Sequence, residues 1–131
     1  MVDSNLFARK NFLDGNWMTT NLSEYFSYNS INENIVVKLN LLRATANEAD
    51  FLKSYLERIP QENCEVMVID LSNCNFVDST FLSNIISFNK KTDLKIKLVV
   101  SDSRQLRIFK ITKIDSIFEI YNSIDKAIAL N

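Results

Sequence analysis

The sequence contains no histidine, and this absence removes whole classes of function. Histidine is the side chain that titrates near neutral pH, and it is the most frequent general base and metal ligand. Histidine-dependent catalytic triads and typical zinc catalysis are therefore excluded. Catalysis by carboxylate, lysine or serine groups alone would need such groups to converge, and no segment of the chain draws them together.

Glycine is almost as scarce, since Gly15 is the only one in the chain. Loops that cradle phosphates need several glycines, because their backbone N–H groups must come close to the ligand. Gly15 also lies outside any expected junction between a strand and a helix. The sequence thus argues against P-loop and Rossmann nucleotide sites, and no cofactor is expected.

Cysteines and long apolar runs are also few. Cys64 and Cys74 stand ten positions apart and fit neither a zinc motif nor a redox pair, so both are interpreted as structural. No apolar run exceeds four residues, whereas a membrane-spanning helix needs roughly 20. The N-terminus lacks the pattern of a secretory signal. We therefore expect no membrane insertion and a cytoplasmic location.

The 131 residues are enough for one domain with its own hydrophobic core. Fifteen basic against sixteen acidic residues give a net charge of -1, which argues against a broad nucleic-acid surface. Basic residues do gather locally, and we interpret them mainly as solvated faces, with a charged partner surface as the alternative. The two local groups are Lys90, Lys91, Lys95 and Lys97, and Arg104, Arg107, Lys110 and Lys113.

The order of patterns along the chain predicts an α/β domain. Residues 1–20 are an N-terminal extension, either a short helix that packs on the domain or a frayed terminus. The domain itself should occupy residues 21–131. Strands are expected at 22–29, 35–39, 66–71, 95–100 and 117–121, and helices at 44–59, 79–91, 102–110 and after Ser123. Strands that alternate with helices imply right-handed parallel crossovers.

Residues 66–80, VMVIDLSNCNFVDST, resemble the centre of STAS domains, the family of bacterial anti-sigma-factor antagonists. There an apolar strand ending in Asp-Leu leads through a short turn to an Asp-Ser-Ser/Thr-Gly-Leu motif. Residues 113–127 are similar to the family's C-terminal strand and helix. The resemblance implies a single STAS-like domain, with a mixed sheet of four or five strands and helices mainly on one side.

In classical members of the family, the serine after the aspartate is phosphorylated by a partner that is both anti-sigma factor and ATP-dependent serine kinase. That serine corresponds to Ser79, and Thr80 is a secondary candidate. The unmodified antagonist binds its partner and frees the sigma factor, phosphorylation stops the binding, and a serine phosphatase restores it. The resemblance thus implies a non-enzymatic module that acts by partner switching, as a monomer or a homodimer. The simpler interpretation is that Asp78 or Ser79 merely caps a helix.

The sequence departs from the family pattern beside the acceptor, where Phe81 replaces the glycine. The family's Gly-x-Leu-Asp signature is also missing at residues 39–43. Helical geometry places Phe81 and Phe88 together on a flank of the helix. One hypothesis is an exposed apolar ledge, so that the partner would bind Asp78, Ser79, Thr80, Phe81 and Phe88. The alternative is that the N-terminal extension or another helix covers both rings.

Two other functions stay open from the sequence. The first is a structural STAS subunit of a signalling scaffold or a transporter complex, without phosphoryl control, and Phe81 favours it. The second is a small enzyme or nucleotide-binding protein, which the lack of histidine and of glycine-rich loops disfavours.

Overall fold

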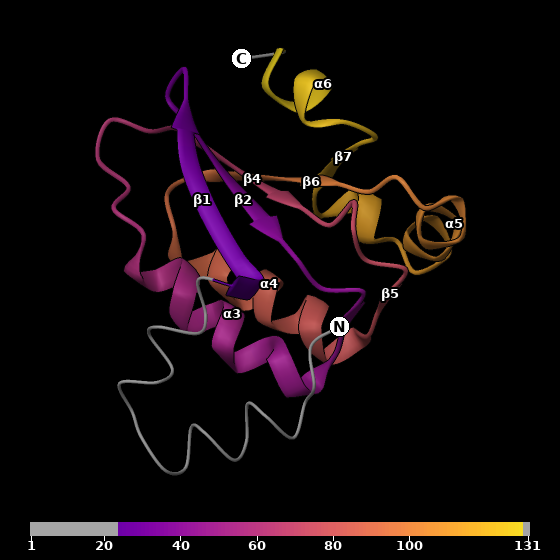
Figure 1. Cartoon of the computed structure of the whole chain (residues 1–131). Coiled ribbons are helices and arrows are strands. Elements are labelled where there is room, and N and C mark those ends of the chain that lie inside the picture. Colours follow the sequence, from indigo (N-terminus) through magenta and orange to yellow (C-terminus); the bar gives the residue numbers. More distant parts are fainter. Residues whose placement is uncertain (1–23, 130–131) are drawn as a thin grey trace, which may run out of the picture.

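The computed structural model describes residues 24–129, so the predicted extension at residues 1–20 lies outside the described residues. Strands and helices alternate along the chain, as the sequence predicts (Figure 1). The elements are β1 (Phe26–Ile31), β2 (Asn34–Leu39), β3 (Arg43–Ala44), α3 (Ala46–Arg58), β4 (Val66–Asp70), β5 (Phe76–Val77), α4 (Ser79–Lys91), β6 (Lys95–Val99), α5 (Ser103–Ile111), the 3-10 helix η1 (Ile114–Ser116), β7 (Glu119–Tyr121) and α6 (Ile124–Ala129).

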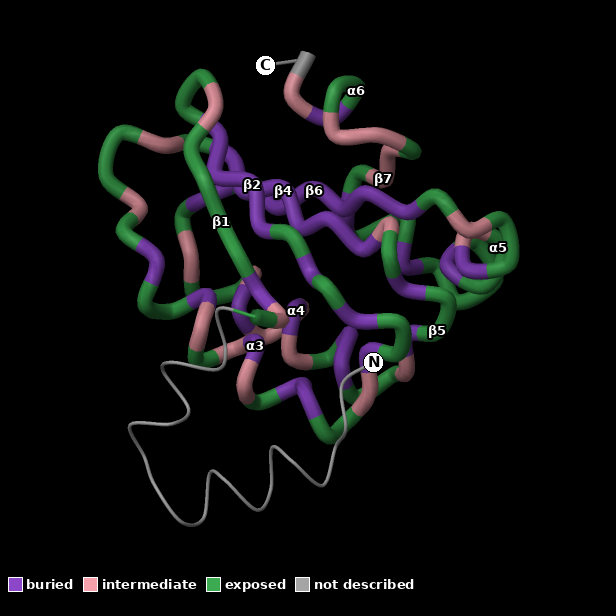
Figure 2. Tube along the Cα trace, in the orientation of Figure 1, coloured by how far each residue is buried: buried purple, intermediate pink, exposed green. Residues whose placement is uncertain are grey.

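Five strands form one mixed sheet in the order β1-β2-β4-β6-β7. β1 is antiparallel to β2, whereas the other neighbouring strands are parallel. All residues of the central strand β4 are buried, as its continuous apolar run predicts. Figure 2 shows the contrast between these buried inner strands and the largely exposed edge strand β1. The predicted mixed sheet is confirmed.

Helices cover mainly one face of the sheet. Successive strand residues point to opposite faces, so the strands contribute to two separate clusters. The larger cluster joins Met67 and Ile69 of β4 to Leu52 of α3, Ile85 of α4 and Phe109 of α5. The smaller one contains valines of β2, β4 and β6 with Ala127 of α6. Figure 1 shows α3 and α4 on one side of the sheet and α6 on the other.

The short helix α6 is held by a buried lysine of the sheet. The Lys97 side chain is only 2% exposed. Its Nζ donates to the backbone oxygen of Ala127 at 2.8 Å and lies 5.3 Å from the centre of the Tyr121 ring. These contacts satisfy a cation whose burial would otherwise be costly.

A second, two-stranded parallel sheet pairs β3 with β5, and the sequence patterns do not predict it. It is extended by backbone hydrogen bonds from Asn75 N to the Leu42 oxygen at 2.8 Å and from Asp78 N to the Ala44 oxygen at 2.9 Å. Two residues are too few to show alternation, which explains the omission. The pairing sets residues 42–46 beside residues 75–78, and it brings the beginnings of α3 and α4 together.

The sequence predicts the boundaries of α4 correctly, but not the start of β7. α4 occupies the predicted residues, whereas the predicted last strand begins two residues later, at Glu119, because η1 precedes it. Lys113 enters η1 with a left-handed backbone, φ 65°. Such a turn stops the α5 helix and is invisible to apolar periodicity.

Candidate functional site

The carboxylate of Asp78 accepts hydrogen bonds from the starts of two helices, although the N-cap of α3 itself is Thr45. Asp78 is the N-cap of α4, where its Oδ1 accepts a hydrogen bond from Phe81 N at 2.9 Å. Its Oδ2 accepts from Ala46 N, the first residue of α3, also at 2.9 Å. A negative charge is favourable at the positive end of a helix, and here it meets two such ends. The sequence predicts the cap of α4, and the hydrogen bond to α3 follows from the β3–β5 pairing.

Ser79 and Thr80 are the first two residues of α4, and both are exposed. Their hydroxyls stand at a helix start where backbone N–H groups lack helical partners. A phosphate on Ser79 would therefore lie close to favourable partial charges, and also close to the Asp78 carboxylate. The structure thus places the two candidate acceptors on the surface, while their modification stays a prediction.

The hypothesis of an exposed ledge at Phe81 and Phe88 is wrong. Phe81 is 0% and Phe88 2% exposed, and both belong to the main core. On the same flank of α4, Asn84 Nδ2 donates to Asp50 Oδ1 of α3 at 3.0 Å. α3 therefore packs along this flank, as the alternative of a covering helix predicts, and neither ring is available to a partner.

Three other residues form an exposed surface before Ser79, and the sequence reasoning missed them. Leu42 is 50% and Phe76 36% exposed. The Arg43 guanidinium lies over the Phe76 ring, 4.3 Å from its centre, which is a cation–π contact. We call Leu42, Arg43 and Phe76 the β3–β5 surface. A signal for it existed, because Leu42 and Arg43 stand in the stretch where the family signature is absent.

The turn that leads to this surface is fixed by its neighbours. Gln105 of α5 donates from Nε2 to the Asn75 oxygen at 3.2 Å, and Gln105 Oε1 is buried without a partner among the described residues. Ser101 Oγ donates to the Ser72 oxygen at 3.2 Å. Burial raises the pKa of the Cys74 thiol to about 12, so this thiol stays neutral, as expected for a structural cysteine.

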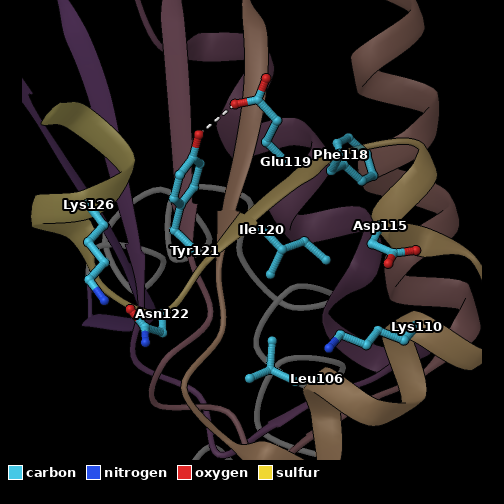
Figure 3. A pocket seen from close by; sticks show the side chains of 9 residues that line it. All are labelled: Leu106, Lys110, Asp115, Phe118, Glu119, Ile120, Tyr121, Asn122 and Lys126. Atoms are coloured by element: carbon cyan, nitrogen blue, oxygen red, sulfur yellow. Dashed lines mark hydrogen bonds between the residues drawn. The ribbon is translucent and has the colours of Figure 1, made fainter. Parts of the chain in front are cut away.

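A separate cavity of about 550 Å³ lies beside the edge strand β7 (Figure 3). Leu106 and Lys110 of α5 face Ile120 and Tyr121 of β7 across it, and none of residues 78–80 lines it. The Tyr121 hydroxyl donates to Glu119 Oε1 at 2.7 Å. The hydrogen bond from Lys95 is the main cause that lowers the pKa of Glu119. Glu119 thus binds both the Tyr121 hydroxyl and the Lys95 ammonium group.

Residues 24–129 contain no group of three or more Cys, Asp or Glu side chains placed to hold a metal ion. No helix in this part of the chain has the length and apolar character needed to cross a membrane.

The fold resembles that of several solved structures. An anti-sigma factor antagonist from Mycobacterium paratuberculosis has a TM-score of 0.70 and 20% identity, over 80% of this chain and 91% of that one. A candidate anti-sigma factor antagonist from Thermotoga maritima has a TM-score of 0.66 and 22% identity, over 79% and 92%. A sulfate transporter family protein from Wolinella succinogenes has a TM-score of 0.66 and 18% identity, over 78% and 87%.

At these identities the structures show the fold alone. A search of curated protein sequences gave no match. The sequence profile of the STAS domain, however, matches residues 26–127, which include the whole sheet, α3, α4 and α5. The resemblance read from residues 66–80 and 113–127 is therefore confirmed, and the chain belongs to the STAS domain family.

Proposed function

We propose that this chain is a non-enzymatic regulatory module of the anti-sigma-factor-antagonist type, switched by phosphorylation at Ser79. The partner would be an anti-sigma factor with serine kinase activity, and a serine phosphatase would reverse the modification. ATP would belong to the kinase, and all three proteins would meet in the cytoplasm. The observation that carries the proposal is the exposed Ser79 directly after a carboxylate that is already committed to two helices.

That arrangement suits a switch based on charge. Asp78 is held by Phe81 N and Ala46 N, so it cannot swing away from a new negative group without losing both hydrogen bonds. A phosphate adds about -1.5 to -2 charge at neutral pH. A partner surface that accommodates the neutral hydroxyl would then face a concentrated negative charge. Binding would be lost even if the fold stayed the same.

The β3–β5 surface supplies the apolar contact that the buried Phe81 and Phe88 cannot. Phe76 on β5 and Leu42 immediately before β3 are large exposed apolar side chains, and these two strands lead directly to the starts of α4 and α3. Aromatic and arginine side chains dominate the energy of many protein interfaces. We propose that this surface binds the same partner, beside Ser79.

Site-mapped phosphorylation tests the proposal. The full chain is incubated with ATP and the anti-sigma serine kinase encoded nearest to its gene, and modified peptides are mapped by mass spectrometry. One phosphate on Ser79 is expected, and Ser79→Ala should abolish it. Ser103→Ala is the matched control, because Ser103 is also an exposed first residue of a helix after aspartate. Phosphate on Ser103 rather than Ser79, or on neither, would contradict the proposal.

A structural subunit of a signalling scaffold or a transporter complex is the second candidate, and Phe81 favours it. Where the family motif has glycine, Phe81 fills the core and commits the start of α4 to packing. Such a subunit would remain in its assembly whatever the charge at position 79. Co-purification that survives Ser79→Asp but is lost in Phe76→Ser would support this candidate over the switch.

A further inference from the structure

Helix α5 presents a face to solvent on which basic and aliphatic side chains are mixed. Ile111 is 72% and Ile108 44% exposed, whereas Gln105 and Phe109 on the inner side are buried. Residues three apart on a helix lie next to each other, so the two isoleucines share the outer surface. Figure 2 shows the exposed turns of α5 at the border of the molecule.

A third exposed isoleucine and several basic residues extend this face. Ile117, which is 47% exposed, follows η1, and η1 packs against α5. Arg104 is close to one carboxylate, with 3.8 Å between its guanidinium and Asp102, yet its side chain stays 76% exposed. We call the following exposed residues of α5 and of the segment after it the basic α5 face: Arg104, Arg107, Ile108, Ile111, Lys113 and Ile117.

The charge of this face stands out from the rest of the protein. Residues 103–117 hold four cations and a single carboxylate, Asp115, whereas the whole chain has a net charge of -1. The remainder of the chain is therefore net negative. Such a charge asymmetry orients a protein, because a negatively charged surface attracts one side and repels the other.

We infer that the basic α5 face docks on a negatively charged lipid surface. Exposed isoleucines can enter the boundary between headgroups and acyl chains, while arginine and lysine reach back to the anionic headgroups. The same cations would also suit an acidic protein, and that occupant is the outcome indicated if the protein binds neither kind of vesicle. Because the inference does not use Ser79, it is independent of the proposed function.

Sedimentation of the full chain with vesicles tests this inference. Phosphatidylcholine vesicles with about 30% phosphatidylserine should carry the protein to the pellet, and pure phosphatidylcholine vesicles should not. High salt should release it, since screening weakens the attraction. Equal binding to both kinds of vesicle, or no binding to either, would overturn the inference.

Matched variants separate this face from general charge effects. Arg104→Gln with Arg107→Gln should lower the partition coefficient by roughly fivefold per cation removed. Lys90→Gln with Lys91→Gln removes the same charge from two exposed lysines at the end of α4 and should leave the partition unchanged. Ile111→Ser keeps every charge and should also weaken binding. Equal losses in the two charge variants, or no loss in Ile111→Ser, would contradict docking through this face.

Discussion

Two helices of this protein begin with the same pair of residues in different surroundings. α4 follows Asp78 and begins with Ser79, and α5 follows Asp102 and begins with Ser103. Both aspartates are N-caps, and both serines are exposed. The Asp78 carboxylate, however, accepts from α3 as well as from α4, while the Asp102 carboxylate accepts from Arg104 N of its own helix at 2.9 Å and lies near the Arg104 guanidinium.

The difference shows that an Asp-Ser pair does not define a site by itself. At α5 the pair is a local cap beside a cation. At α4 it joins two helices, and a phosphate would meet an aspartate that is already held in place. The α5 start is thus an internal control for each claim about the α4 start, since it has the same residues without the second helix.

Substitution of the third residue of each helix should give the largest difference in stability between α4 and α5. Phe81 is fully buried in the main core, so Phe81→Ala should lower the free energy of unfolding by about 3–5 kcal/mol. Gln105 occupies the same position in α5 and donates a hydrogen bond to the Asn75 oxygen, so Gln105→Ala should cost only about 1–2 kcal/mol. Urea denaturation measures both values. A loss below about 1 kcal/mol for Phe81→Ala would mean that the ring is exposed, as the ledge hypothesis held.

Removal of the two capping aspartates should give the next largest difference in stability. Asp78→Ala removes hydrogen bonds to two helix starts and should destabilise the protein by about 2–3 kcal/mol. Asp102→Ala removes one local cap, with an expected cost of about 1 kcal/mol. Chemical denaturation of the two variants, side by side, provides the check. Equal costs would show that the bond to Ala46 adds nothing to stability.

The turn before α4 contains a buried thiol, and its titration gives a pH dependence. The pKa of Cys74 is raised from 9.0 to about 12 in the folded chain, mainly by burial. As pH rises, the thiol ionises in the unfolded chain before it ionises in the folded chain. The contribution of the thiol to the free energy of unfolding is therefore complete below pH 9 and is lost as pH rises toward 12, by about 1.4 kcal/mol per pH unit. The free energy of unfolding should therefore fall less steeply with rising pH in Cys74→Ala than in the parent chain. A slope in that variant equal to the parent's would refute the shift.

The serines themselves should matter least to stability. Ser79→Ala and Ser103→Ala each remove an exposed hydroxyl, and each should change the free energy of unfolding by less than about 0.5 kcal/mol. Thermal unfolding of the two variants checks this. A much larger cost for Ser79→Ala would assign the hydroxyl a structural role, and binding data on Ser79 variants would then need correction for folding.

The same residues show which parts of the fold and of the candidate site the sequence predicts. Asp78 as cap and α4 as a helix are read directly, because N-capping and apolar periodicity are local properties. The burial of Phe81 depends on the packing of α3 against α4. Because α3 is distant in sequence, local patterns do not predict this packing. The bond from Asp78 to Ala46 and the β3–β5 surface depend on the same two-residue strands, and these are too short for any pattern to reveal.

The most direct test of the account compares partner binding by Ser79→Asp and Ser103→Asp. Each variant adds one negative charge at the first residue of a helix that is capped by aspartate. We predict that Ser79→Asp weakens binding to the anti-sigma serine kinase at least about tenfold in Kd, while Ser103→Asp binds like the parent chain. Full binding by Ser79→Asp, or equal weakening in both variants, would contradict a switch located at Ser79.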